Sequence, residues 1–540
     1  MVLPLDRRLD SRDVGCLGHF PALLEEAPRF GCGYGRSVFE IAQGLRSPMN
    51  TSTRREPAPE LTICPVVTGL WQVADLERGG RVLDVEQAAL AMKSYFDAGL
   101  TTFDMADHYG SAEDIAGVFR SRYGGNRAQL LTKWVPSPGA ITKQDVRAAV
   151  QKSLRRLQTE RIDLLQFHAW NYADPMWLDC LYWLHELKAE GLIAQLGLTN
   201  FDSAHLEMIV RSGIEIASNQ VCYSLLDQRA AGPMTAACLR HGVKLLAFGT
   251  VAGGFLSGKW LNRDEPRLDD TLTWSQMKYK RYIDTAGGWT RFQALLRVLH
   301  EVGLARGMSM ANVASRYILE QPVVAGVIVG ARLGQSEHIA ENKALLAQSL
   351  GAADKQKIQM ALQELERIPG DCGDEYRKPP FLTASGDLSH HMDAPVPPYP
   401  CRAGTDGRHR VLTGTAWEDI AGYSRALRVG DRILVSGTTA THGTRHVGGA
   451  DPALQMHFVI DKIEGAIQSL GGSLQDVVRT RVFVRNIADW EAVARVHGER
   501  FRGIQPVNTM VGAELVGDEY LVEMEAEAVL PRTAAATGST

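Results

Sequence analysis

Between residues 60 and 330, short runs of apolar and β-branched residues alternate with longer amphipathic stretches. Each short run has the length of a buried strand, and each longer stretch repeats its apolar positions at the spacing of one helix face. Eight successive strand–helix units predict an α/β protein with a closed (β/α)₈ TIM barrel. The predicted strands are Val66–Trp71, Thr101–Asp107, Leu130–Trp134, Ile162–His168, Ile193–Asn200, Ile216–Tyr223, Lys244–Thr250 and Val324–Gly330.

The stretch after the third strand illustrates how such a helix begins. Thr142 stands three residues before Asp145, which predicts a capping box at a helix start. Val146, Val150 and Leu154 then share one helical face that can pack against the barrel wall. An open doubly wound sheet is the alternative fold. It is disfavoured because no Gly-x-Gly-x-x-Gly turn follows the first strand.

A second, smaller domain follows the barrel. A predicted helix at Ala352–Arg367 gives way to a proline-rich stretch typical of a linker. Beyond it, strands at Arg432–Ser436 and Leu521–Val529 flank helix-like sequence, which predicts an α+β domain. The resulting division is an N-terminal extension at 1–58, a barrel at 59–370, a linker at 371–410, the α+β domain at 411–532 and a tail at 533–540.

Composition narrows the class of protein. The 540 residues are 45% hydrophobic and 22% charged, and the net charge of −4 gives no basic surface for nucleic acid. No apolar run reaches the roughly 18 residues that span a bilayer, and the start lacks a signal-peptide core. The eight cysteines contain no Cys-x-x-Cys pair, so neither a zinc site nor a disulfide framework is expected. We expect a cytoplasmic protein without a metal. We expect the N-terminal extension to be either disordered or the product of a wrongly assigned start codon. Import into an organelle through this extension stays open.

Four polar residues stand at the carboxyl ends of predicted strands, where TIM barrels carry their chemistry. They are Asp104, Tyr109, Lys133 and His168. A tyrosine, whose ordinary pKa is about 10, donates a proton more readily beside an ammonium that stabilises its phenolate. Lys133 can supply that ammonium and Asp104 can orient it, while His168 can hydrogen-bond a substrate carbonyl. Each residue alone is commonly structural, but the four together indicate carbonyl reduction.

These residues lie in motifs that resemble the aldo-keto reductase family, over residues 61–370. The matching segments are Phe103–Gly110, Leu131–Lys133 and Phe167–His168. The resemblance implies that the four residues form a catalytic tetrad. It also implies NADPH as the cofactor and a small carbonyl compound as the substrate.

The resemblance further implies a set of cofactor-binding residues. Thr199, Asn200 and Gln220 match positions that hold the nicotinamide carboxamide, and Phe248 stands where an aromatic ring stacks on the nicotinamide. A basic residue in many members is replaced here by His338, and Arg332 can supply the missing charge for a 2′-phosphate. The remaining expected contacts are Gly69, Leu70, Trp71, Gly330, Gln335, Glu341 and Asn342.

The second domain resembles the reactive-intermediate deaminase (Rid) family, also called endoribonuclease L-PSP, through Tyr423–Ala426, Arg432–Gly437 and Glu523–Ala526. The family forms trimers with clefts between subunits, in which an arginine clamps a substrate carboxylate and a glutamate assists water. Tyr423 and Glu523 match cleft positions, but Asn508 replaces the arginine. Since an amide lacks the charged fork that a carboxylate prefers, the sequence favours a trimerisation or small-molecule binding role.

The sequence thus predicts an NADPH-dependent oxidoreductase that reduces an aldehyde or ketone and forms a homo-oligomer through its second domain. Two alternatives remain open. One is a non-catalytic cofactor-sensing or scaffold protein, and the other is a bifunctional reductase and imine deaminase. The complete tetrad favours the enzyme.

Overall fold

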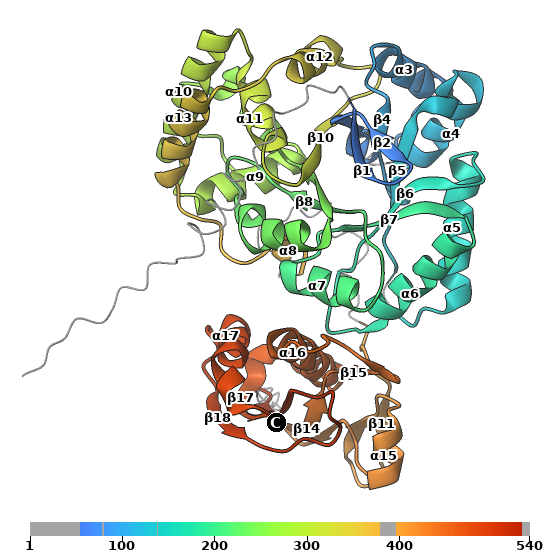
Figure 1. Cartoon of the computed structure of the whole chain (residues 1–540), viewed down its shortest axis with the longest axis vertical. Helices are drawn as coiled ribbons and strands as arrows, with labels where there is room; N and C mark the ends of the chain where they lie inside the picture. Colours follow the sequence, from blue (N-terminus) through green and yellow to red (C-terminus); the bar gives the residue numbers. More distant parts are fainter. Residues whose placement is uncertain (1–53, 78–79, 138, 270, 378–395, 532–540) are drawn as a thin grey trace, which may run out of the picture. The chain divides into compact units, whose positions relative to one another are not determined.

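The computed structural model describes residues 54–77, 80–137, 139–269, 271–377 and 396–531. The larger part is a closed barrel in the order β10-β3-β4-β5-β6-β7-β8-β9, with every neighbouring pair parallel (Figure 1). Its strands are β3 (Val66–Gly69), β4 (Thr102–Asp104), β5 (Gln129–Trp134), β6 (Ile162–Phe167), β7 (Ile193–Thr199), β8 (Ser218–Cys222), β9 (Lys244–Phe248) and β10 (Val324–Gly330). The predicted TIM barrel is confirmed.

Several strands end before the residue at which the apolar pattern stops. The first was predicted to reach Trp71 and the second Asp107, but they end at Gly69 and Asp104. Leu70 and Met105 remain completely buried beyond those ends, because the chain stays in the barrel mouth after it leaves the ladder. Burial and strand pairing therefore stop at different residues.

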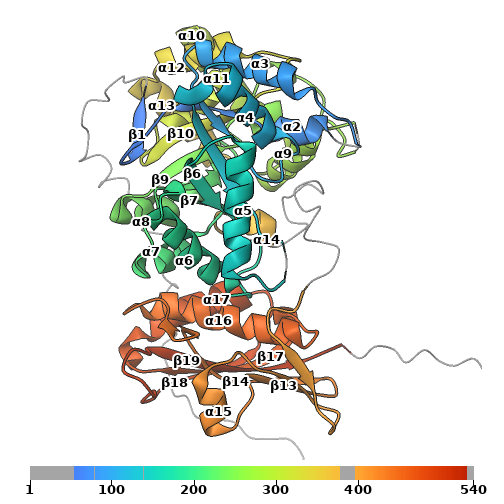
Figure 2. The ribbon, with the colours of Figure 1, turned by 90° about the vertical axis from the view of Figure 1, so that its right-hand side faces the viewer.

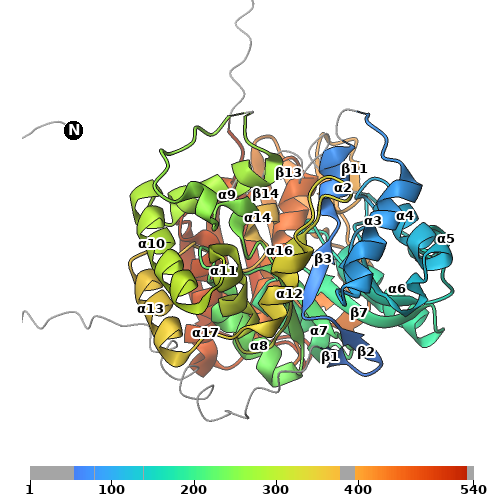
Figure 3. The same ribbon diagram turned by 90° about the horizontal axis from the view of Figure 1, so that it is seen from above.

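Helices surround the barrel, as Figure 3 shows for α3 to α5 on one side and α10, α11 and α13 on the other. The capping box that the sequence predicts at Thr142 is present, with Thr142 Oγ1 accepting from Asp145 N at 3.3 Å and Asp145 Oδ2 accepting from Thr142 N at 2.8 Å. The helices are α3 (Val85–Asp97), α4 (Ala112–Arg122), α5 (Lys143–Arg156), α6 (Met176–Ala189), α7 (Ser203–Arg211), α8 (Pro233–His241), α10 (Trp289–Arg306), α11 (Met310–Leu319), α12 (Ile339–Ala347) and α13 (Ala352–Gln363).

Five further elements of the larger part have bounds that the sequence did not predict. A hairpin of β1 (Arg55–Ala58) and β2 (Leu61–Ile63) sends Leu61 and Ile63 into the cluster that fills the barrel interior. Two short helices, α2 (Trp71–Leu76) and α14 (Asp374–Arg377), and the longer α9 (Trp274–Thr285) complete the set. All three helices supply residues near the carboxyl ends of the barrel strands.

The smaller part is a seven-stranded mixed sheet with α16 (Pro452–Ser469) and α17 (Trp490–Phe501) along one face (Figure 2). This confirms the predicted α+β architecture. The outermost strands are β11 and β18. In sheet order the strands are β11 (Cys401–Ala403), β12 (His409–Val411), β13 (Ala426–Val429), β14 (Arg432–Thr439), β19 (Val522–Val529), β17 (Val477–Val484) and β18 (Val507–Gly512), and α15 (Ala416–Ala421) precedes β13.

Most of the predicted N-terminal extension and tail, and residues 378–395 of the predicted linker, lie outside the described residues. Within the described ranges, no helix is both long and apolar enough to cross a bilayer. Cys64, Cys180, Cys222, Cys238, Cys372 and Cys401 are present as thiols.

Candidate active site

A buried ion pair lies at the carboxyl ends of β4 and β5. Lys133 Nζ is 2.6 Å from Asp104 Oδ2 and donates a further bond of 3.0 Å to the Met105 carbonyl oxygen. Burial lowers the pKa of Lys133, while the Asp104 carboxylate acts in the opposite direction. The barrel therefore fixes a lysine nitrogen, with two acceptors, at one position in its mouth.

The second oxygen of Asp104 is also engaged. Asp104 Oδ1 accepts from Gln166 Nε2 at 3.0 Å and from Gln220 Nε2 at 2.7 Å. The two amides are themselves joined, with Gln220 Nε2 donating to Gln166 Oε1 at 2.8 Å. The Gln220 nitrogen thus supports the carboxylate, and the expectation that Gln220 holds the cofactor carboxamide stays a prediction. Gln166 was not among the predicted site residues, and its one sequence signal is an amide within an apolar strand, β6.

Tyr109 lies in the turn between β4 and α4, beside the ion pair. Lys133 Nζ is 5.2 Å from the centroid of the Tyr109 ring. Trp71 packs edge-on against the same ring, with centroids 5.0 Å apart and planes at 74°, and His108 contacts it at 4.8 Å. The structure thus brings Asp104, Lys133 and Tyr109 together, as the sequence predicts, and adds an aromatic wall from α2.

His168 follows β6 directly and is 4% exposed. Its backbone nitrogen donates to the Trp134 carbonyl oxygen at 3.1 Å, so it stands one strand further around the same rim than Lys133. Its ring stacks on Trp170 at 4.8 Å and meets the edge of Tyr376 at 5.3 Å. An aromatic group from α14 therefore lines the histidine side of the site.

Lys278, from α9, is a residue of this wall that the sequence analysis missed. Lys278 Nζ donates to Tyr376 Oη at 2.6 Å and lies 5.4 Å from the centroid of the Phe248 ring. Helix-like sequence was expected after the strand at Lys244–Thr250, but nothing in it marked this lysine as a site residue. The contacts of Lys278 with Tyr376 and Phe248 place α9 between α14 and the end of β9.

Two buried oxygen atoms at the end of β7 offer unused hydrogen-bonding capacity. Thr199 Oγ1 and Asn200 Oδ1 are buried and have no hydrogen-bond partner among the described residues. Buried polar atoms in native proteins are nearly always satisfied. A polar group bound in the barrel mouth would satisfy both, so these residues fit a nicotinamide carboxamide. Phe248, half-buried at the end of β9, stands on the same rim.

The segment after β10 leads into the N-terminus of α12. Gln335, His338 and Glu341 are exposed there, whereas Asn342 is buried. His338 Nδ1 lies 2.9 Å from Glu341 Oε2. The N-cap of α12 has no side-chain hydrogen bond, so its first backbone N–H groups are available to an anion.

Gly69 and Gly330 are neighbours in the register of β3 and β10. A Cβ on Gly330 would lie 2.6 Å from Gln72 Oε1, so a side chain there would displace the amide of Gln72. Leu70, next along the chain, is completely buried, and Trp71 begins α2. Because Gly330 has no side chain, Gln72 of α2 can lie close to the end of β10.

Acidic and cysteine side chains also meet at the rim, where Cys222, Asp227 and Glu375 could present ligand atoms within 4.8 Å of one another. The guanidinium of Arg229 already occupies both carboxylates, with Nη2 at 2.7 Å from Asp227 and 2.8 Å from Glu375. Burial is the largest influence on the pKa of Glu375 and raises it, but Arg229 and Lys278 together with hydrogen bonds make the net shift downward. This cluster is an ion-pair network that fixes α14.

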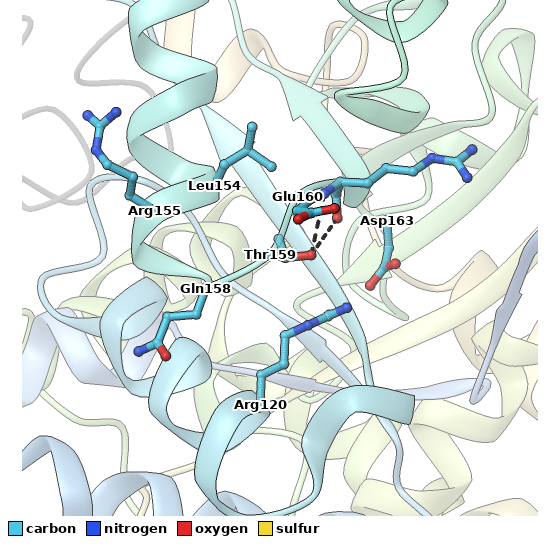
Figure 4. Close-up of a pocket in the computed structure, with 8 residues that line it drawn as sticks. Arg120, Leu154, Arg155, Gln158, Thr159, Glu160 and Asp163 are labelled. Carbon is cyan, nitrogen blue, oxygen red and sulfur yellow. Dashed lines mark hydrogen bonds between the residues drawn. The ribbon is translucent and has the colours of Figure 1, made fainter.

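A surface hollow of about 730 Å³ lies elsewhere on the barrel (Figure 4). Its lining includes Arg120, Thr159 and Asp163, the last of which is near the start of β6. The tetrad residues stand at the opposite ends of the strands. The hollow is therefore not part of the candidate active site.

In the second domain, Glu523 and Asn508 face opposite sides of the sheet. Glu523 lies between the buried residues Val522 and Met524 on β19, so it faces away from the helices. Asn508 is paired in register with the buried Thr480 and donates to Thr480 Oγ1 at 2.9 Å. One chain therefore does not bring the two predicted cleft residues to one surface.

Arg425 is a cation that acts electrostatically on this glutamate. It is 4% exposed and donates to the Gly437 carbonyl oxygen, to Thr438 Oγ1 and, at 2.9 Å, to Tyr423 Oη. Burial raises the pKa of Glu523, and Arg425 partly offsets the shift. The guanidinium is thus committed to groups of its own domain.

The rim described above is that of a barrel oxidoreductase. The Aldo/keto reductase family model matches residues 65–363, and the Endoribonuclease L-PSP model matches residues 413–530. Over its barrel, the chain belongs to the aldo/keto reductase family, and a domain of the second family follows it.

Relatives align with each part separately. The human aldo-keto reductase family 7 member A3 is 31% identical over 219 residues, which are 38% of this chain and 66% of that protein. The glycerol dehydrogenase of Gluconobacter oxydans is 25% identical, with a TM-score of 0.50, and covers 60% of this chain and 98% of its own. An uncharacterized protein of Streptomyces coelicolor is 37% identical over 120 residues, 22% of this chain and 90% of that protein.

Proposed function

We propose that the barrel reduces an aldehyde or ketone to an alcohol with NADPH, and that Tyr109 donates the proton. The observation that carries this proposal is the buried Lys133 nitrogen, 2.6 Å from Asp104 and 5.2 Å from the Tyr109 ring centroid. Family membership supports an oxidoreductase. The presence of all four tetrad residues favours an enzyme over a scaffold.

Within this proposal each residue has a separate task. Asp104 holds the Lys133 nitrogen in place, and the lysine charge stabilises the phenolate that Tyr109 becomes after proton transfer. His168 positions the carbonyl oxygen by hydrogen bonding. The bound nicotinamide supplies the hydride. The aromatic residues Trp71 and Trp170 exclude water around the reacting carbon.

A panel of aldehydes and ketones tests the function directly. NADPH absorbance is followed after each carbonyl compound is added to the full-length protein. We expect oxidation of NADPH with at least one class of substrate and formation of the matching alcohol. Failure across aliphatic, aromatic and dicarbonyl compounds would favour the sensing or scaffold alternative.

For the cofactor, we propose that Thr199 and Asn200 hold the carboxamide and that Phe248 stacks on the nicotinamide ring. At the other end, Arg332 and the N-terminus of α12 take the 2′-phosphate, with Gln335, His338, Glu341 and Asn342 around the adenine. The uncapped helix N-terminus and the unpartnered oxygens of Thr199 and Asn200 support this assignment.

We expect NADPH to bind at least about tenfold more tightly than NADH, since a charged contact to the 2′-phosphate contributes roughly 1.5 to 3 kcal/mol. Fluorescence titration of the protein with each cofactor measures both dissociation constants. Arg332→Met should weaken NADPH binding and leave NADH binding unchanged. Equal constants for the two cofactors in the unaltered protein would contradict the assignment.

For the second domain, we propose a trimerisation or small-molecule binding role. The two long helices α16 and α17 cover one face of its sheet, while valines on several strands remain exposed, among them Val429, Val478, Val507 and Val529. Because Glu523 and Asn508 face opposite sides, a cleft containing both needs a second copy. Both observations favour association of copies through this domain.

The isolated segment 405–535 should therefore form a trimer, which light scattering can measure. The Streptomyces relative, most of which aligns with this domain alone, supports its production as a separate protein. Replacing Val478 with Lys, which puts a charge on the exposed face, should shift the segment toward the monomer. A monomeric unaltered segment would contradict the proposal.

A further inference from the structure

Glu77, the residue directly after α2, makes contacts that the proposed chemistry does not use. Its carboxylate faces the start of α4, where Oε2 accepts from Ser111 N at 2.9 Å and Oε1 accepts from Ser111 Oγ at 2.6 Å. Oε1 is also 3.4 Å from Leu83 N. A single side chain thus binds both donors of the residue two positions after Tyr109.

The turn between Tyr109 and Ser111 is built around this carboxylate. Gly110 has φ +54°, which glycine adopts without strain, and a Cβ there would lie 1.9 Å from Glu77 Oε2. Any side chain at position 110 would therefore displace the carboxylate. The close fit shows that the glycine serves the contact as well as the backbone conformation.

The contact also completes the first turn of α4. Ser111 is the N-cap of this helix, and its own side chain makes no capping bond. Glu77 accepts the backbone N–H of the N-cap residue, as the N3 acid of a capping box does, and its negative charge lies at the positive end of the helix dipole. The start of α4 is therefore fixed to the end of α2.

The same short helix contacts Tyr109 itself. Trp71, the first residue of α2, packs against the phenol ring at 5.0 Å. Glu77 holds the chain two residues later, and Ala112 N donates to the Tyr109 carbonyl oxygen at 3.0 Å. The phenol is thus restrained through its ring, by Trp71, and through its backbone, by the turn that Glu77 fixes.

We propose that Glu77 is a positioning residue of the reductase site, which holds the Tyr109–Ser111 turn so that the phenol stays beside Lys133. The inference rests on the proposed reductase activity. Glu77 binds Ser111 and Leu83, and through Ser111 it acts on the turn that carries Tyr109. A displaced proton donor slows the chemical step, whereas the proposed carboxamide and 2′-phosphate contacts come from the ends of β7, β9 and β10.

The test compares Glu77→Ala and Glu77→Gln in the full-length protein. We expect kcat to fall about 10- to 100-fold in the alanine variant, because small misplacements of a reacting group have effects of this size. The glutamine variant, which keeps an acceptor oxygen, should lose less. The dissociation constant of NADPH should change less than about twofold. The solvent isotope effect on kcat should rise as proton transfer becomes limiting.

Glu86→Ala is the matched control. Glu86 comes from α3 and contacts Arg122 and Tyr123 at the other end of α4, where Tyr123 Oη donates to it at 3.1 Å. A role of Glu77 in helix stability alone predicts equal losses of activity in the two alanine variants and no change in isotope effect. That result, or a Glu77→Ala variant with unchanged kcat, would overturn the inference while leaving the reductase proposal intact. An unaltered protein without carbonyl turnover would overturn both.

Discussion

Replacing Tyr109 with Phe should remove nearly all carbonyl reduction. The substitution deletes the hydroxyl and keeps the ring that packs against Trp71 and lies over Lys133 Nζ. Because general acid catalysis contributes about 10²- to 10⁴-fold, kcat should fall by that factor. Steady-state rates with the best carbonyl substrate give kcat, and fluorescence titration should show unchanged NADPH binding.

Tyr123→Phe provides a matched control for this substitution. Tyr123 stands at the carboxyl end of α4, and its hydroxyl donates to Glu86 rather than to any group at the rim. Its loss should leave turnover within about twofold, as expected of a surface hydrogen bond. Full activity in Tyr109→Phe would show that another group donates the proton and would refute the tetrad assignment.

The isolated second domain should hydrolyse simple α-imino acids at least about 100-fold more slowly than an active Rid-family enzyme, because a charge-assisted clamp on the carboxylate is missing. Asn508 stands where the family has arginine, and its amide donates to Thr480. Arg425 is committed within the domain, and Arg479 and Arg481 each pair with a glutamate of β19. Each of these three described arginines therefore has a protein partner in place of a substrate carboxylate.

The assay generates imines in situ with an amino-acid oxidase and follows release of the keto acid. Asn508→Arg should increase the rate above that of the unaltered domain, and Glu523→Gln in the same background should remove the gain. Release by the unaltered domain as fast as by the active enzyme would mean that another cation serves the carboxylate.

The sequence predicted the barrel and the meeting of Asp104, Lys133 and Tyr109 because both follow from local pattern and closure. Inward positions near the ends of adjacent parallel strands converge once the barrel is closed. The amide of Gln220 illustrates what local pattern leaves open. Its nitrogen has several acceptors within reach, and the choice of Asp104 and Gln166 depends on strands elsewhere around the barrel.

Elements without an apolar pattern were also missed. Strand β18 exposes most of its residues, so no alternation marks it. The contact from Glu77 to Ser111 joins residues separated by 34 positions, and neither residue type is unusual there. Helix α9 begins 26 residues after β9 ends, so the strand–helix alternation does not fix where it lies. Such features are fixed by tertiary packing rather than by residue type.

The two parts differ in how their sheets end. The barrel is closed, whereas the second sheet stops at β11 and β18, and on β18 Val507 and Val511 are 65% and 42% exposed. An open strand with apolar side chains is a template for unwanted pairing with other chains. When it is produced alone at high concentration, this domain should therefore precipitate more readily than the barrel. Conditions that favour ordered association should keep it in solution.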